Sequence, residues 1–218
     1  MKIEKFPYTV PLSEEIENIL RERILKGEYD IGQRIKENSV AEELKVSRTP
    51  IREAFKGLEQ EGLIVTIPNR GSFALGLTKK DIQDIYAVRI LVEALAVEWA
   101  VERIKDDEIS SLEDIFEKME FYTYKKDSKK VLELNRAFHE IIYRASGSRF
   151  LAQILRSYQE YVEKTRKATV YEKNLPTILE EHREILVTMR ERNADKAIAR
   201  ISAHLINSKK RTEESLKL

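Results

Sequence analysis

The sequence has no cysteine, and this absence removes several kinds of chemistry at once. Disulfide bonds, thiolate zinc sites and a cysteine nucleophile are excluded, so any metal must be held by histidine, carboxylate or amide groups. No apolar run approaches the roughly 18 residues that a membrane-spanning helix needs. The first ten residues also lack the apolar core of a signal peptide. These absences predict a cytoplasmic protein with no membrane partner.

Glycine and proline are scarce, at 7 and 5 of 218 residues, and they are unevenly placed. After Gly76 only Gly147 and Pro176 remain. This shift indicates short elements joined by turns at the front of the chain and long helices behind them. The predicted domains therefore cover residues 1–76 and 77–218.

An excess of charge of one sign is also missing, since 39 Lys and Arg face 38 Asp and Glu. Residues 1–77 hold 12 basic and 13 acidic side chains. A nucleic-acid contact in this segment therefore requires basic side chains that are concentrated on one face.

The front segment shows the element order helix, helix, helix, hairpin, which is typical of a winged helix-turn-helix. The predicted elements are a helix capped by Ser13 and ended by Gly27, a strand over 34–36, a helix capped by Asn38 or Ser39, a helix from Ser47 to Gly62, and strands over 63–68 and 72–75 joined by a turn at 69–71. Such a fold would place the third helix in the major groove of duplex DNA.

The third predicted helix carries two stripes of different character. Ile51, Phe55 and Leu58 have the spacing of a buried face. A second stripe, on another face, consists of Arg48, Arg52 and Lys56. Long donors of this kind suit guanine edges and phosphates. At the hairpin tip, Arg70 suits a phosphate or minor-groove contact and Gly71 permits close backbone approach.

Residues 46–55 read VSRTPIREAF, and residues 69–73 read NRGSF. These motifs resemble the signature of the GntR family of bacterial regulators over about residues 10–76. The resemblance implies DNA contacts by Arg48, Thr49, Arg52 and Gly71. Asn38 stands where some members carry arginine, so a phosphate contact is expected there rather than a base contact.

The back of the chain shows only helical periodicity. In its first helix, apolar residues repeat at three and four, as at Ile82, Ile85, Val88, Val92 and Leu95. The predicted helices cover 79–104, 107–124, 128–146, 149–170, 177–192 and 194–215. The expected fold is mainly α, with the winged helix-turn-helix followed by an all-α antiparallel bundle of six or seven helices.

All three histidines lie in this predicted bundle. Asn135 and His139 are four residues apart and share a helix face. His182 and His204 each lie 11 residues from the predicted turn at Asn193, so in an antiparallel hairpin they stand at equal height. The three histidines can therefore converge in the bundle core, where helical bundles commonly hold metals.

Residues 134–139 (LNRAFH), 181–186 (EHREIL) and 203–205 (AHL) resemble the effector domain of the FadR-type branch of these regulators, the FCD domain. The resemblance implies a divalent transition metal, with zinc or nickel favoured and manganese or iron also suited to such ligands. The matching ligand positions are Asn135, His139, His182 and His204.

Four neutral ligands would leave the full charge of the metal and one or two open positions, which favours a small organic carboxylate as effector. Arg89 could pair with that carboxylate, although an ion pair with Glu93, four residues on, is equally expected. Tyr143 and Asn207 are further candidates for lining the effector site.

The leading hypothesis is a ligand-responsive transcription regulator, acting as a homodimer on a near-palindromic operator in double-stranded DNA. One alternative is a DNA-binding protein with structural histidines and no metal effector. Another is a metal-dependent hydrolase. The hydrolase is disfavoured because Tyr143 stands where an H-E-x-x-H motif starting at His139 needs its second histidine, and the expectation is that the protein is not an enzyme.

Overall fold

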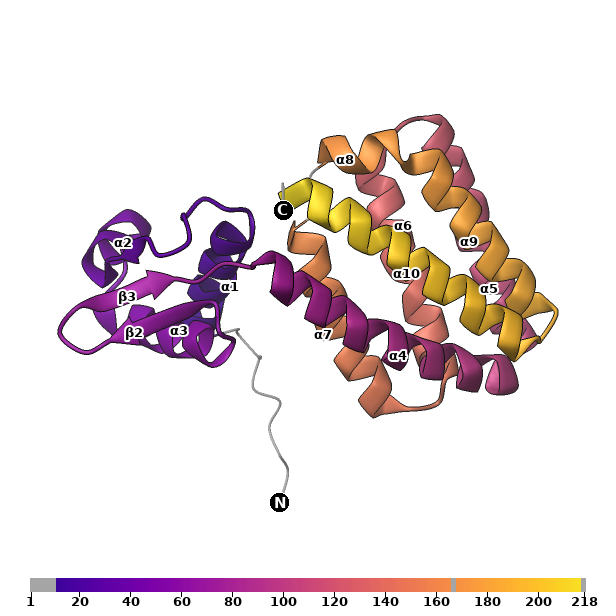
Figure 1. Ribbon diagram of the computed structural model, residues 1–218, viewed down its shortest axis with the longest axis horizontal. Helices are drawn as coiled ribbons and strands as arrows, with labels where there is room; N and C mark the ends of the chain where they lie inside the picture. Colours follow the sequence, from indigo (N-terminus) through magenta and orange to yellow (C-terminus); the bar gives the residue numbers. More distant parts are fainter. Residues whose placement is uncertain (1–10, 166–167, 217–218) are drawn as a thin grey trace, which may run out of the picture. The chain divides into compact units, whose positions relative to one another are not determined.

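The computed structural model of the chain describes residues 11–165 and 168–216, and the prediction about the first ten residues lies outside them. The chain divides into two compact units, the first ending at Leu77 and the second beginning at Thr78. The first unit contains three helices and a small sheet, and the described part of the second contains helices only (Figure 1). The mainly α fold class is confirmed.

The first unit has the predicted order of helices and hairpin. Its elements are α1 (Leu12–Leu25), β1 (Arg34–Ile35), α2 (Glu37–Leu44), α3 (Arg48–Gln60), β2 (Ile64–Ile67) and β3 (Gly71–Ala74). β3 lies between β1 and β2 and is antiparallel to both. The predicted apolar stripe of α3, at Ile51, Phe55 and Leu58, is buried. Each such side chain contributes roughly 1.5–3 kcal/mol through burial.

Two predicted helix starts are wrong. α1 begins before Ser13, because the carbonyl of Pro11 already accepts hydrogen bonds from the next turn, and Pro11 is its N-cap. α2 likewise begins before Asn38 and Ser39, because Lys36 is its N-cap and its carbonyl accepts from Val40. In both cases the capping side chains that the sequence offers lie inside the first helical turn.

The second unit is a bundle of long helices. Its described elements are α4 (Lys79–Arg103), α5 (Asp106–Tyr124), α6 (Ser128–Ala145), α7 (Arg149–Thr165), α8 (Ala168–Lys173), α9 (Leu175–Arg190) and α10 (Ala194–Leu216). α4 opens with a capping box, in which the side chains of Thr78 and Asp81 each accept a hydrogen bond from the other residue's backbone N–H. The helix predicted over 149–170 covers α7 and the start of α8, and residues 166–167 lie outside the described part.

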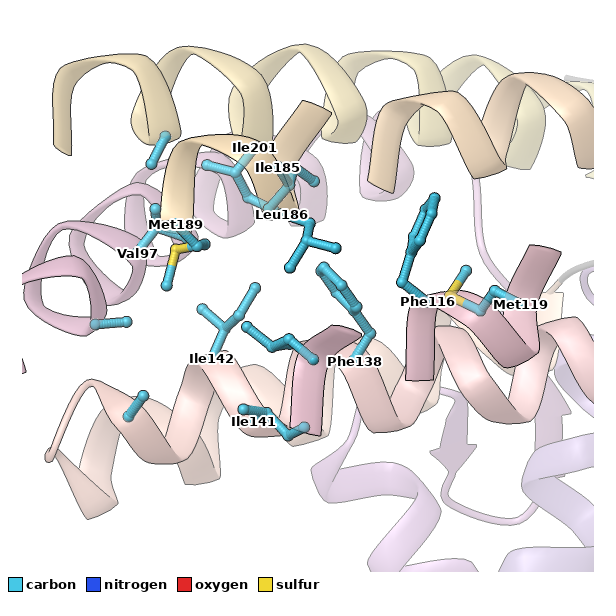
Figure 2. Packing of buried hydrophobic residues seen from close by; sticks show 14 of the residues in the cluster. Val97, Phe116, Met119, Phe138, Ile141, Ile142, Ile185, Leu186, Met189 and Ile201 are labelled. Atoms are coloured by element: carbon cyan, nitrogen blue, oxygen red, sulfur yellow. The ribbon is translucent and has the colours of Figure 1, made fainter. Parts of the chain in front are cut away.

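A continuous apolar core lies between α4, α5, α6, α9 and α10 (Figure 2). Phe138 of α6 is fully buried in it, and its ring meets the ring of His182 edge-on at 5.1 Å between centroids. This packing fixes the height of α6 against α9. The core thereby supports the polar cluster described below.

The helical repeat that predicts α4 does not mark its buried face. Ile82 is buried, but Val88 and Leu95 of the same repeat are 44% and 36% exposed. The buried face instead carries Arg89 and Glu93. No described helix is both long and apolar enough to cross a membrane.

Candidate nucleic-acid interface and metal centre

α3 separates apolar and basic side chains onto different faces. Ile51 and Leu58 are fully buried, whereas Arg48, Arg52 and Lys56 are all exposed. Thr49, at the start of the helix, is exposed as well. The two stripes predicted from the sequence therefore lie on different faces of α3, although the segment as a whole is not basic.

Arg52 is paired with an acidic residue in the free protein. Its Nε donates to Glu37 of α2 at 2.9 Å, with 62% of the arginine side chain exposed. Exposed pairs of this kind are worth about 1 kcal/mol or less, so Glu37 holds the Arg52 side chain only weakly.

The wing is the hairpin of β2 and β3. Its turn needs left-handed backbone at Asn69, with φ 61°, and at Gly71, with φ 98°. A Cβ on Gly71 would lie 2.8 Å from Nε of the flexible Arg34 side chain, which would have to move, and the φ of 98° is a backbone conformation that L side chains rarely adopt. Arg70 is exposed at the tip, and its phosphate or minor-groove contact stays a prediction.

A groove runs between the start of α2 and the wing. Its lining includes the predicted residues Asn38 and Gly71 together with two basic residues, Arg34 and Lys36. Sequence reasoning missed both. They flank the buried Ile35 on β1, and this basic-apolar-basic alternation was the available signal.

The three histidines converge, as predicted, from three helices. His139 lies on α6, His182 on α9 and His204 on α10, and all three are buried. Ring centroids are 4.8 Å apart for His182 and His204, 5.4 Å for His139 and His182, and 5.2 Å for His139 and His204. One ring nitrogen from each lies within 4.8 Å of the other two. Asn135, one turn before His139 on α6, is buried too.

The two nitrogens of each ring have different surroundings. Nδ1 of His182 is 2.7 Å from the carbonyl oxygen of Ile178, and Nδ1 of His204 is 2.8 Å from Glu181 Oε2. Nδ1 of His139 is 3.4 Å from Glu93 Oε2. The Nε2 atoms of His139 and His182 are buried without a hydrogen-bond partner. Since buried polar atoms are normally satisfied, this nitrogen set fits a metal ion.

The charge state of the rings also suits metal binding. Burial, reinforced by the neighbouring histidines, lowers the pKa of His182 well below its ordinary value. Burial also lowers the pKa of His204 to about 4, although Glu181 opposes the shift. Both rings are therefore neutral near pH 7 and have a lone pair available for a metal.

Glu181 holds His204 in place and is itself fully engaged. Arg211 donates to both of its oxygens, at 3.0 and 2.8 Å, and Asn207 donates at 2.9 Å. Burial would raise the pKa of Glu181, but His204 and Arg211 outweigh it and lower the pKa to about 2. Sequence reasoning missed Glu181, although it directly precedes His182. Asn207, which the sequence predicts to line the effector site, donates to this carboxylate.

Arg89 forms the ion pair that the sequence offered as its alternative role. Its Nε donates to Glu93 Oε1 at 2.6 Å, and Tyr143 donates to the same oxygen at 3.0 Å. Burial would raise the pKa of Glu93, but Arg89 and His139 outweigh it and lower that pKa. Nη1 of Arg89 is buried without a hydrogen-bond partner. Arg89 and Tyr143 are thus joined to the histidine cluster through Glu93, a residue that the site prediction did not include.

Comparisons with known proteins find matches in both units of the chain. Residues 12–73 match the gntR family of bacterial regulatory proteins, and residues 84–207 match the FCD domain. The chain is 32% identical to the transcriptional regulator YdhC of Bacillus subtilis, covering 86% of this chain and 84% of that one. It is 33% identical to the gluconate operon repressor of the same species, covering 66% and 59%. The structure of Escherichia coli McbR superposes with a TM-score of 0.72 at 21% identity, covering 95% and 100%.

Proposed function

The chain belongs to the gntR family of bacterial regulatory proteins and carries an FCD domain, and we propose that it is a homodimeric repressor controlled by a carboxylate bound at a divalent metal. It is a DNA-binding transcription regulator and not an enzyme, since the relatives it matches are regulators. The hydrolase alternative therefore falls away. The sign of regulation is carried over from the gluconate operon repressor.

One observation supports the metal above all others. Three buried imidazoles from three helices bring one ring nitrogen each to within 4.8 Å of the others, and the Nε2 atoms of His139 and His182 have no hydrogen-bond partner. We assign His139, His182 and His204 as ligands, with Asn135 as the fourth. Imidazole and amide donors suit zinc or nickel, and also accept manganese or iron. When bound, the metal supplies a positive centre for an anion.

Metal-binding measurements distinguish this proposal from the alternative in which the histidines are only structural. Protein purified without a histidine tag is expected to contain close to one metal per chain by elemental analysis, and metal-free protein is expected to bind Zn²⁺ at submicromolar concentration. His182→Ala should abolish binding, whereas Thr188→Val, another buried polar residue of α9, should not. A wild-type protein that binds neither Zn²⁺ nor Ni²⁺ at micromolar levels would establish the structural alternative.

For the DNA contacts we propose residues of α3, the wing and the start of α2. Arg48, Thr49, Arg52 and Lys56 would enter the major groove, while Arg70, Gly71 and Asn38 would meet the backbone. All of these residues except the half-buried Gly71 are exposed, and their exposure and the matched family support this assignment. Footprinting on an operator selected from random sequence, with wild type and Arg52→Ala, tests it.

For the homodimer we propose the exposed apolar stripe of α4 as the contact with a second copy. Val88, Leu91 and Leu95 are 44%, 73% and 36% exposed, and their spacing places them on one side of the helix. A patch that repeats on a second copy can bury itself around a two-fold axis. Two copies related in this way would match a near-palindromic operator.

A further inference from the structure

Glu93 lies between the metal ligands and the candidate effector arginine. Its Oε1 accepts hydrogen bonds from Arg89 and Tyr143, and its Oε2 lies 3.4 Å from Nδ1 of His139. Its side chain is 1% exposed, so water cannot screen its charge. One carboxylate therefore acts on two functional groups at once.

The second buried carboxylate of the site provides a contrast. Each oxygen of Glu181 accepts a hydrogen bond from Arg211. Each also has a second partner, which is Asn207 for Oε1 and His204 for Oε2. The Arg89–Glu93 pair is less complete, because Nη1 of Arg89 and Oε2 of Glu93 are buried without a hydrogen-bond partner. Such an incomplete buried pair is costly unless a further ligand completes it.

We propose that Glu93 is an internal counter-anion that strengthens metal binding through His139 and competes with the effector carboxylate for the positive charge of Arg89 and the metal. The inference rests on the proposed function. The positive charges of a metal at the histidines and of the Arg89 guanidinium together exceed the single negative charge of Glu93. This excess positive charge would attract an effector carboxylate, and the charge of Glu93 determines its size.

Glu93→Gln keeps the shape of the side chain and removes its charge, so the proposal predicts effects of opposite sign. Zn²⁺ affinity of the metal-free protein should fall about 10–100-fold, as for other groups that orient a metal ligand. Acetate, used as the carboxylate probe, should bind the Co²⁺-loaded variant about fivefold or more tightly, because one buried opposing charge is gone. The visible absorption of Co²⁺ reports acetate at the metal directly.

Two further variants separate charge from shape. Glu102→Gln, an exposed change on the same helix, should alter neither affinity. Glu93→Asp keeps the charge but shortens the reach to His139, so Zn²⁺ affinity should fall about fivefold or more while acetate affinity stays within about twofold. If Glu93→Gln does not fold, this variant carries the test, and a wild-type Zn²⁺ affinity in it overturns the proposal.

The outcomes are distinct from those for the proposed function. Loss of both affinities in Glu93→Gln, or unchanged acetate affinity, means that Glu93 is only structural, even though wild-type protein binds metal and responds to carboxylate. A wild-type protein that binds no metal removes the proposed function and this inference with it.

Discussion

A buried neutral histidine makes stability depend on pH in a definite direction. The pKa values of His182 and His204 are lowered in the folded chain, to about 4 for His204, whereas an unfolded histidine titrates near 6.5. Between these values the unfolded chain takes up protons that the folded chain does not. The free energy of unfolding therefore falls as pH drops through this window and is insensitive to these groups above it.

We expect metal-free protein to lose about 1.4 kcal/mol of stability per pH unit through His204 between about pH 6.5 and 4, and a further loss through His182 as the pH falls below about 6.5. Urea unfolding at several pH values measures the slope. His204→Gln removes one titrating group, so the slope should fall by about 1.4 kcal/mol per pH unit. The contribution of Glu181 is lost as the pH falls from its ordinary pKa of 4.5 to its folded pKa of about 2, which lies below most of the histidine window. A slope that is flat across the window would contradict the buried neutral assignment.

Arginines at the start of α3 give the second prediction at this scale. Arg48→Ala and Arg52→Ala should each weaken specific operator binding by about 1–3 kcal/mol, because each removes a long donor from the groove-facing side. Fluorescence anisotropy with a selected operator measures the loss. Lys26→Ala removes the same charge from the exposed end of α1 and serves as the control. Equal effects in all three variants would show that only net charge matters.

Among the helices, α4 and α10 share a buried polar seam. The Tyr86 hydroxyl lies 2.9 Å from Ser208 Oγ and 2.8 Å from Thr212 Oγ1. The tyrosine ring is fully buried, so its hydroxyl depends on these partners. This cluster fixes the register of α10 against α4 near the Arg89–Glu93 pair.

Tyr86→Phe should lower the free energy of unfolding by about 1–2 kcal/mol, because it leaves buried hydroxyls with fewer partners. Tyr124→Phe, at an 84% exposed position of α5, should change it by less than about 0.5 kcal/mol. Chemical denaturation followed by circular dichroism measures both. No difference between the two variants would mean that the seam contributes nothing to stability.

The helices also show how much of the fold could be predicted from the sequence. α3 was predictable because its apolar and basic stripes follow one helical period. The starts of α1 and α2 were not predictable, because several adjacent residues could cap each helix. The first helical hydrogen bonds go to the carbonyls of Pro11 and Lys36, which precede the expected caps.

Some features of the candidate site could be predicted from the sequence and others could not. The equal distances of His182 and His204 from a turn can be counted in the sequence. The burial of Glu93 cannot, because glutamate is usually exposed and its partner Tyr143 lies 50 residues away. Glu181 likewise reaches Arg211 across 30 residues. Side chains that orient ligands depend on contacts between helices, which helical periodicity alone does not specify.

At the scale of the whole molecule, an operator with two similar halves requires two copies of α3 held together. The apolar stripe of α4 is the surface we assign to that contact, and Leu91, at 73% exposed, is its most accessible member. Single exposed apolar residues are common, but three on one helical stripe are what a self-association surface needs.

Leu91→Glu places like charges on both copies of this surface, so the variant should be monomeric at micromolar concentration in sedimentation velocity. Its affinity for the full operator should fall about tenfold or more, whereas affinity for a half-site should stay unchanged, because α3 itself is intact. Phe121→Glu, a matched change at a 54% exposed position of α5, should remain dimeric. A dimeric Leu91→Glu protein with wild-type operator affinity would place the self-association surface elsewhere than on α4, and a monomeric wild type would remove the dimer itself.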